Sequence, residues 1–407
     1  MENDANDISQ IQRKEYLERL ISLKDKDLIK VISGIRRAGK STLFQLYIEW
    51  LKTVGNVSQE QIIFLNFEDM ANYSLCEAQK LCEYIMNFAP KNTRTYIFLD
   101  EVQQVNEFQR AVDGLFVHKN FDIYITGSNA YFLSGELATL LSGRYIEIKI
   151  LPLSFSEYIY ALGGDKSDLQ KKYLSYITNS SFPYALQLEN QNDIHSYLEG
   201  IYNTILVKDI LTRTGISDTA LLNSVIAFIF DTIGNPISAT NIANTLPSKG
   251  RKVSVHTIES YLEAMTNSFI CYKVQRYDVK GKIILSTQAK YYVADIGLRY
   301  YLLGAKTSDR GHILENIVYL ELVRRGFQIY VGKIYDVEVD FIAVKNGEEI
   351  YYQVAYSVLD DATLERELKP LNMIKNHNQK FLLTMDYEAV SHNGIKQQNV
   401  LEWLLEK

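Results

Sequence analysis

The stretch SGIRRAGKST, from Ser33 to Thr42, has the spacing GxxxxGK[ST] of a phosphate-binding loop. It lies between the apolar run LIKVIS (28–33) and the helical pattern STLFQLYIEWL (41–51). Glycines let backbone N–H groups wrap phosphates, and a helix N-terminus adds positive potential. We predict that Lys40 reaches the β- and γ-phosphate oxygens of a nucleotide and that Ser41 ligates Mg²⁺. The predicted nucleotide-binding residues are Gly34, Ile35, Arg36, Arg37, Ala38, Gly39, Lys40, Ser41 and Thr42.

Strand-length apolar runs continue after this loop. They are IIFLNF (62–67), YIFLD (96–100), IYIT (123–126) and YIEIKI (145–150). Helical patterns separate the four runs from LIKVIS to IYIT. This alternation is typical of an α/β domain with a mainly parallel sheet. The sequence therefore predicts the parallel-sheet domain of a P-loop NTPase.

Polar residues follow YIFLD and IYIT, the third and fourth apolar runs counted from LIKVIS. YIFLD ends in Asp100-Glu101, at the sheet edge where ligands of parallel sheets gather. We predict that Asp100 holds Mg²⁺ and that Glu101 polarises the attacking water, which makes the expected reaction hydrolysis. Ser128 and Asn129 follow IYIT, and they either orient water and sense the γ-phosphate or form a simple turn.

Arg144 precedes the fifth run, after the helical pattern SGELATLLSG. In this place it is either an arginine finger, which stabilises the transition state at a neighbour's nucleotide, or part of an intramolecular salt bridge. The finger role requires a homo-oligomer.

Arg36 and Arg37 are unusual within such a loop. They either pair with Glu68 or Asp69 after the second run, or contact a partner's phosphate. We favour the ion pair.

Residues 221–300 read as three short helices followed by a β-ribbon, which suggests a winged helix-turn-helix. Basic residues precede the third helix and occupy the ribbon turn, where such modules touch DNA phosphates. Glu259 and Glu263 on the third helix disfavour groove reading, and winged helices also bind proteins. The predicted DNA contacts are Lys249, Arg251, Lys252, Lys280 and Lys282.

The segment VEVDFIAVKNGEEIYYQVAYSV predicts a β-hairpin with its turn at Asn346-Gly347. In that register Asp340 faces Gln353 and Glu338 faces Ala355, all four on one side of the sheet. Strict alternation places Val337, Val339, Phe341, Tyr352 and Val354 on the other side.

Glu315 lies in an apolar helix, HILENIVYLEL, where an unpaired carboxylate is costly. Together with Asp340 and the hairpin it resembles the PD-(D/E)xK nuclease constellation, which implies Mg²⁺ held by oxygen ligands. Here Gln353 replaces the acid and Ala355 the lysine, so we expect a degenerate site of Glu315, Glu338, Asp340 and Gln353. Alternatively, Glu315 is simply tied to nearby backbone or to His312.

A family resemblance covers essentially the whole chain. GIRRAGKST, YIFLDEVQ, TGSNAYFLSGELATLLSGRYIEIKILPLSFSEY, VADIGLR and GHILENIVYLELVRRG resemble a large prokaryotic family of AAA-type ATPases with a nuclease-like C-terminal domain of unassigned function. The resemblance implies ATP and Mg²⁺ as cofactors. It also implies Walker A roles for Lys40 and Ser41, Walker B roles for Asp100 and Glu101, a sensor role for Asn129 or Ser128, and a finger role for Arg144.

We therefore expect an AAA-like ATPase domain with a helical lid (1–200), a winged-helix domain (201–305) and a degenerate nuclease-like domain (306–407). The net charge of −6 gives no general attraction to nucleic acid. Three cysteines without a CxxC pair, a polar acidic N-terminus and no membrane-length apolar run lead us to expect a cytoplasmic protein.

Three functions compete. The first is an oligomeric, DNA-associated ATPase whose cycle moves the two downstream domains. The second is a nucleotide-gated switch or scaffold that binds a protein partner. The third is an ATP-regulated, metal-dependent DNA nuclease.

Overall fold

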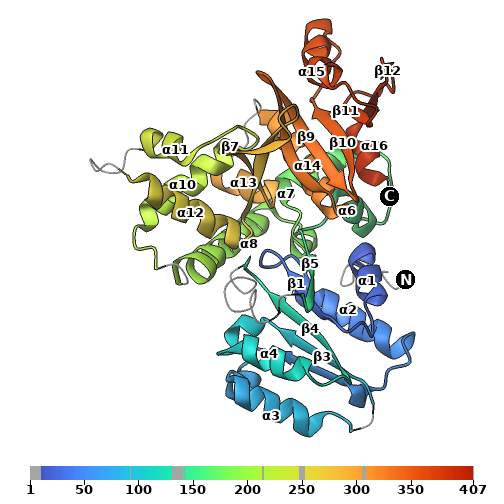
Figure 1. Cartoon of the computed structure of the whole chain (residues 1–407), viewed down its shortest axis with the longest axis vertical. Coiled ribbons are helices and arrows are strands. Elements are labelled where there is room, and N and C mark those ends of the chain that lie inside the picture. The colour runs from blue at the N-terminus through green and yellow to red at the C-terminus, as the bar shows by residue number, and fades with distance from the viewer. Residues whose placement is uncertain are drawn as a thin grey trace. The chain divides into compact units, whose positions relative to one another are not determined.

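The computed structural model describes residues 11–91, 93–130, 141, 143–212, 215–246, 253–304 and 309–406. The chain divides into two compact units, which are described separately (Figure 1). Unit 1 comprises Met1–Pro152 with Asn267–Phe269, and unit 2 comprises Leu153–Thr266 with Ile270–Lys407.

Unit 1 contains a five-stranded parallel sheet with the order β2-β3-β4-β1-β5. Its strands are β1 (Ile29–Ser33), β2 (Ile62–Asn66), β3 (Thr95–Asp100), β4 (Phe121–Gly127) and β5 (Tyr145–Lys149). Its α-helices are α1 (Lys14–Ser22), α2 (Lys40–Thr53), α3 (Ala78–Phe88) and α4 (Phe108–Phe116). The predicted parallel sheet of an α/β domain is therefore confirmed.

Side chains of these strands alternate between two covered faces. Residues such as Val31 and Leu99 pack in one core with α3 and α4. On the other face, the Phe98 ring lies 5.1 Å from that of Phe44 in α2. Figure 1 shows α2 on one side of the sheet and α3 and α4 on the other. Because both faces are buried, the strands read as continuous apolar runs.

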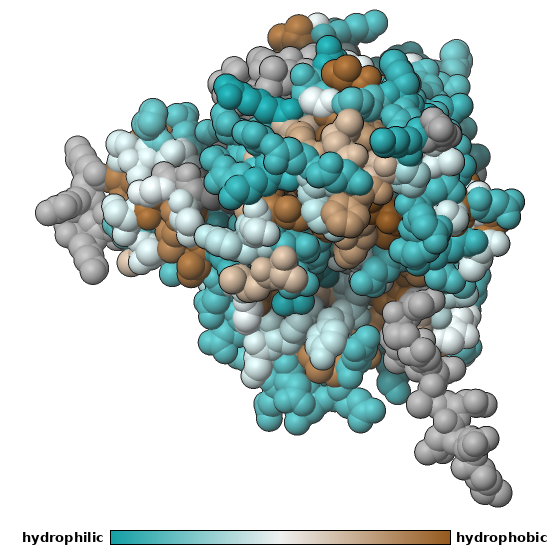
Figure 2. All heavy atoms as spheres, turned by 90° about the horizontal axis from the view of Figure 1, so that it is seen from below, coloured by the Kyte–Doolittle hydropathy of each residue, from teal (hydrophilic) through white to brown (hydrophobic). Residues whose placement is uncertain are grey.

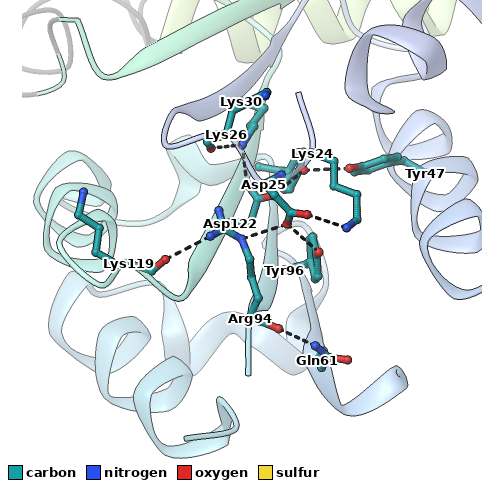
Figure 3. Close-up of polar contacts among 11 residues, drawn as sticks. Lys24, Asp25, Lys26, Lys30, Tyr47, Gln61, Arg94, Tyr96, Lys119 and Asp122 are labelled. Atoms are coloured by element: carbon teal, nitrogen blue, oxygen red, sulfur yellow. Dashed lines mark hydrogen bonds and ion pairs between the residues drawn. The ribbon is translucent and has the colours of Figure 1, made fainter. Parts of the chain in front are cut away.

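A buried ion pair holds the start of β1, at the far end of this strand from the phosphate loop (Figure 3). Lys30 Nζ donates to Asp122 Oδ1 at 2.5 Å and to the Lys26 carbonyl oxygen at 2.7 Å. Asp122 Oδ2 accepts from the Asp25 backbone N at 2.9 Å and from the Tyr124 hydroxyl at 3.0 Å. The bonds tie β1 to β4 and to the segment before β1.

Unit 2 is built on an eight-stranded mixed sheet with the order β12-β13-β11-β10-β9-β8-β6-β7. Its strands are β6 (Cys271–Asp278), β7 (Ile283–Val293), β8 (Gln328–Ile334), β9 (Val337–Lys345), β10 (Glu348–Val354), β11 (Lys380–Thr384), β12 (Ser391–His392) and β13 (Ile395–Asn399). Its α-helices are α6 (Phe155–Ala161), α7 (Leu169–Asn179), α8 (Gln191–Thr204), α10 (Thr219–Asp231), α11 (Ala239–Thr245), α12 (Val255–Asn267), α13 (Ile296–Leu303), α14 (Arg310–Arg324), α15 (Asp361–Met373) and α16 (Val400–Leu405).

The predicted β-ribbon forms, but it is not the wing of a separate domain. Strands β6 and β7 pair with each other, and β6 also pairs in parallel with β8. The ribbon is therefore the edge of the C-terminal sheet, and the predicted border at residue 305 falls inside one compact unit. The winged-helix domain is therefore not confirmed, since a ribbon after three helices has the same local sequence pattern whether or not one of its strands pairs with a further strand.

The predicted hairpin and its register are confirmed. Lys345 pairs with Glu348 around the Asn346-Gly347 turn, and the ladder continues to Phe341 opposite Tyr352. The predicted faces are partly wrong, because the register between β8 and β9 shifts between Tyr330 and Gly332. A bulge inserts one extra residue and re-aims the side chains that follow.

The consequence of this bulge is visible in the packing of β9. Val339 belongs to a core that also contains Ile342 and α15 residues. Phe341 instead lies beside Tyr292 and Tyr319, with ring centroids 5.6 and 6.3 Å away. Val339 and Phe341 therefore do not share a face, contrary to strict alternation.

No helix within the described part of the chain is long and apolar enough to cross a membrane. On the face drawn in Figure 2, apolar side chains are interspersed with hydrophilic ones.

Candidate active site

The phosphate loop connects the end of β1 to the start of α2. Gly34 has φ 145°, and a Cβ there would meet the Ile150 carbonyl oxygen at 2.1 Å. Gly39, with φ 97°, occupies the N-cap position of α2. Both positions need glycine, the first for close approach and the second for its left-handed backbone. The loop thus closes tightly over the sheet edge. Within it the side chains of Ile35 and Ala38 are buried, and Thr42 in the first turn of α2 is exposed.

Lys40 is only 4% exposed, and its ammonium group stays at the loop. Its Nζ donates to the carbonyl oxygens of Gly34 at 3.1 Å and Ile35 at 3.3 Å. Glu101 Oε1 lies 3.7 Å from it. The cation is therefore held mainly by neutral carbonyls, which an incoming phosphate can outcompete because it carries charge.

Asp100 ends β3 fully buried beside the loop. Its carboxylate accepts from the hydroxyl of Ser41, from Thr126 Oγ1 at 2.6 Å and from Asn66 Nδ2 at 3.1 Å. Burial raises the pKa of Asp100 above its ordinary value, against the effect of these hydrogen bonds. Ser41 and Asp100, the two predicted Mg²⁺ ligands, are thus in contact. A hydroxyl and one carboxylate fit Mg²⁺, which takes its other oxygens from water and phosphates.

Glu101 follows in a left-handed conformation, with φ 54°. Its backbone N donates to Thr126 Oγ1 at 2.8 Å, and its Oε2 accepts from Gln103 Nε2. Burial alone would raise the pKa of Glu101, but Lys40 and Arg36, with hydrogen bonds from Gln103 and Ser128, hold it below its ordinary value. Glu101 is therefore an ionised carboxylate aimed at the loop.

The turn after β4 supplies the next neighbours of Glu101. Ser128 hydrogen-bonds Glu101, and Gln103 Nε2 lies 3.4 Å from Ser128 Oγ. Asn129 is fully buried beside Ser128 in the same turn. The two predicted sensor positions are thus at the sheet edge that carries Asp100 and Glu101.

Sequence reasoning missed Gln103, Asn66 and Thr126. Each sits at or just beyond the carboxyl end of a strand, and each holds Asp100 or Glu101 in place. A polar residue that closes an apolar strand was the available signal, because parallel strands bring such ends to one edge.

The two loop arginines have different environments. Arg36 Nη1 pairs with Glu68 Oε1 at 3.0 Å, as favoured from the sequence. Asp69 instead caps the following 3₁₀ helix by accepting from the Ala71 backbone N. Arg37 is exposed in a left-handed conformation, with φ 65°.

Arg144 forms an ion pair with Asp113 of α4, and both side chains are partly exposed. Of its two predicted roles, the intramolecular salt bridge is therefore seen within this chain. The finger role concerns a neighbouring chain and stays a prediction.

The predicted nuclease-like residues meet around a lysine that sequence reasoning missed. Lys290 of β7 is 2% exposed, and its Nζ lies 2.8 Å from Glu315 Oε1, 2.6 Å from Glu338 Oε1 and 3.8 Å from Asp340 Oδ1. The Tyr292 hydroxyl also donates to Glu315 Oε1, at 2.6 Å. The signal was a lysine inside the apolar run AKYYV, because a buried cation needs a partner.

The charges in this cluster shift one another's pKa values. Burial would lower the pKa of Lys290, but Glu315, Asp340 and Glu338 raise it above its ordinary value. Burial and the charge of Glu315 raise the pKa of Asp340 well above its ordinary value. Gln353 Nε2 donates to Glu367 Oε2 at 2.9 Å, and Gln353 Oε1 accepts from the Asp340 backbone N at 3.3 Å. An ammonium group thus lies where the carboxylates converge.

This arrangement does not fit a divalent cation. Among the residues that the structure describes, no three or more His, Cys, Asp or Glu side chains are grouped to hold a metal ion. Glu315 also has His312 Nδ1 at 3.6 Å, the alternative partner expected from the sequence.

Three of the predicted DNA contacts, Lys249, Arg251 and Lys252, lie outside the described residues. Lys280 is in the β6–β7 turn, where its Nζ lies 4.1 Å from the centre of the Tyr335 ring. Lys282 is exposed in the same turn, with φ 52°.

Family models match two segments of the chain. One described as an AAA domain matches residues 26–159, and one described as a Domain of unknown function (DUF8612) matches residues 170–309. The first match coincides with the sheet that carries the phosphate loop.

Relatives extend over both segments. An uncharacterized protein of Haemophilus influenzae is 42% identical over 400 residues, which cover 97% of this chain and 99% of that protein. Uncharacterized protein MJ1544 of Methanocaldococcus jannaschii is 32% identical over 357 residues, 84% of this chain and 77% of that protein.

Solved structures show more distant likeness. The Walker-type ATPase PABY2304 of Pyrococcus abyssi has a TM-score of 0.48 at 16% identity, covering 72% of this chain and 95% of that one. The Aeropyrum pernix ORC1 protein in complex with DNA has a TM-score of 0.34 at 11% identity, covering 72% and 92%. From the sequence relatives and the matching domain model, this chain belongs to the family of the Haemophilus influenzae and Methanocaldococcus jannaschii proteins, and its residues 26–159 are an AAA-type P-loop ATPase domain.

Proposed function

We propose that this protein hydrolyses ATP with Mg²⁺ at the carboxyl edge of the unit 1 sheet. The observation that carries the proposal is the convergence of a cation, a hydroxyl and two carboxylates at one loop. Lys40 lies 3.7 Å from Glu101, and Ser41 bonds Asp100. Phosphoryl transfer needs mainly positioning and electrostatic stabilisation, which this arrangement can supply.

Each residue has a distinct task in this proposal. The loop amides and Lys40 bind the β- and γ-phosphates, while Ser41 and Asp100 would hold Mg²⁺, which supplies neutralisation of phosphate charge. Glu101, kept ionised, orients the attacking water and accepts a proton from it as a general base. Gln103 and Ser128 keep the Glu101 carboxylate in place through hydrogen bonds.

Glu101→Gln tests the hydrolytic step. We expect kcat to fall about 10²- to 10⁴-fold because the base is lost, while ATP binding with Mg²⁺ persists. The matched control is Glu107→Gln, at the exposed start of α4, which pairs only with surface Arg110 among its described contacts. A Glu101→Gln protein with wild-type turnover would show that hydrolysis does not pass through this carboxylate.

We further propose that the active form is a homo-oligomer in which Arg144 reaches a neighbour's nucleotide. Its support is position, since Arg144 is partly exposed and precedes β5, where AAA-type proteins place the finger. Arg144→Ala should lower kcat about 10³-fold or more if the finger operates. Stability should change by less than about 1 kcal/mol, because an exposed ion pair contributes little. Turnover that is near normal, or independent of protein concentration, removes the finger role.

We propose that the nucleotide state is passed to unit 2, with DNA as the partner it presents. The support is the exposed Lys282 with Lys280 in the β6–β7 turn, together with the basic segment Lys249 to Lys252. The measurement is the ATPase rate with and without DNA, repeated after Lys249, Arg251 and Lys252 become Ala. An unchanged rate in all cases favours a protein partner. A DNA nuclease is not the function this geometry supports best, because Lys290 takes the cation position.

A further inference from the structure

Arg36 is placed unlike an ordinary surface arginine. It is the third residue of the phosphate loop, and its side chain is only 9% exposed. Glu68, with which Arg36 forms an ion pair, is 44% exposed, so the guanidinium end of the pair is buried and the carboxylate end is partly hydrated. For the carboxylate, separation of the pair has a small free-energy cost because water can hydrate it. The buried guanidinium, in contrast, needs another anion to replace the carboxylate.

The guanidinium lies beside the segment that follows β2. Arg36 Nη1 is 3.0 Å from Glu68 Oε1, and Asn66 in the same segment donates to Asp100 Oδ2 at 3.1 Å. Glu101 is the residue proposed to orient water beside the terminal phosphate. Arg36 is therefore on the side of the loop where β2 and β3 end, next to the residues proposed to act on the terminal phosphate.

The segment that carries Glu68 is also bonded to the magnesium-binding carboxylate. Asn66 Oδ1 accepts from the Glu68 backbone N at 2.8 Å, and Asn66 Nδ2 donates to Asp100 Oδ2 at 3.1 Å. The Phe67 backbone N donates to the Asp100 carbonyl oxygen at 3.1 Å. The residues after β2 thus contact both halves of the site, through Arg36 and through Asp100.

We propose that Arg36 is a γ-phosphate ligand that Glu68 holds in reserve, and that a third phosphate transfers the guanidinium from Glu68 to the nucleotide. The proposal rests on the proposed ATPase function. A guanidinium binds phosphate through two parallel N–H donors, which gives phosphate the advantage over a half-hydrated carboxylate. The 3₁₀ helix after Glu68, Met70–Leu75, then loses one tie to the loop whenever ATP is bound.

The test compares the affinities of β,γ-imido-ATP and ADP, each with Mg²⁺, by calorimetry. Arg36→Gln should weaken the triphosphate about 10- to 100-fold and leave ADP nearly unchanged, because one charge-assisted contact to the γ-phosphate is lost. Arg36→Lys should recover part of the loss, since it keeps the charge without the paired donors. Arg110→Gln, which breaks the exposed pair with Glu107, is the matched control and should change neither affinity.

Glu68→Gln tests the same proposal with a change in the opposite direction. The Glu68 side chain is 44% exposed, so this substitution does not disturb a buried site. It removes the competing charge, so triphosphate affinity should rise severalfold while ADP affinity stays the same. Equal losses of both affinities in Arg36→Gln would assign Arg36 a structural role and overturn the proposal, as would an unaltered triphosphate affinity in Glu68→Gln. Failure of the ATPase function itself looks different, because the wild-type protein would then either bind neither nucleotide or bind both without turnover.

Discussion

Lys40 and Lys290 are both nearly buried beside carboxylates, yet their surroundings differ. Lys40 Nζ is held by two neutral carbonyls, with Glu101 at 3.7 Å. Lys290 Nζ has carboxylate oxygens at 2.6 and 2.8 Å and a third at 3.8 Å. The first ammonium has charge left to offer to an anion, while the second is already neutralised.

This difference separates a binding cation from a structural one. A phosphate that arrives at Lys40 displaces weak acceptors and gains a charge-assisted contact. An anion at Lys290 would have to displace three carboxylates, and a divalent cation would have to displace the ammonium. Residue types alone would rank both clusters as chemical sites, but the contacts favour only the first.

The largest effect should come from Lys290→Met. Removing one partner of a buried ion cluster leaves uncompensated charges, so we expect the free energy of unfolding to fall by about 3–5 kcal/mol. Urea unfolding measures it, with exposed Lys282→Met as a control that should stay within about 0.5 kcal/mol.

A second substitution sharpens this result. Adding Glu315→Gln to Lys290→Met removes one of the stranded carboxylates, and should recover about 1–3 kcal/mol through the coupling of neighbouring sites. A single variant as stable as the wild type would break the comparison, because Lys290 would then not be structural.

Lys40→Met should have the next largest effect, and on turnover instead of stability. We expect kcat/KM for ATP to fall about 10²- to 10³-fold, the usual result of removing one preorganised donor to a reacting oxygen. The urea midpoint should fall less than in Lys290→Met, because Lys40 Nζ has one carboxylate oxygen, at 3.7 Å, whereas Lys290 Nζ has three carboxylates around it. A strongly destabilised Lys40→Met protein would mean that the two lysines play the same part.

The smallest effect is a pH dependence in the Lys290→Met protein. Without the ammonium, burial and mutual repulsion raise the pKa of the carboxylates, so the folded state binds more protons than the unfolded chain. Stability then falls as pH rises above the ordinary carboxyl range. The loss of unfolding free energy relative to wild type should therefore be smaller at pH 5 than at pH 8, which urea unfolding at the two pH values measures.

The wild-type protein should show less of this dependence. The raised pKa of Asp340 makes stability fall with pH, while the lowered pKa of Glu315 makes it rise, so the two contributions oppose each other. If the loss of unfolding free energy in Lys290→Met does not depend on pH, the pKa values of the carboxylates have not changed. Water molecules would then hydrate the carboxylates in place of the ammonium group.

Much of unit 1 could be predicted from the sequence because its signals are local. The loop Gly34 to Ser41, its flanking strand and helix, and the acidic pair after β3 each lie within a short window. Parallel topology then brings the strand ends to one edge without further information. The Asn346-Gly347 turn set the hairpin register in the same local way.

Only the tertiary structure could decide the rest, since the contacts involved join distant residues. The pairing of β6 with β8 absorbs the supposed wing into one sheet, and the bulge opposite β8 separates Val339 from Phe341. Lys290 meets Glu338 across 48 positions of chain, and no spacing rule encodes that approach. Sequence thus determined which chemical groups are present at each strand end, while folding decided which charges cancel and which remain available, because the Coulomb energy depends on distance and burial.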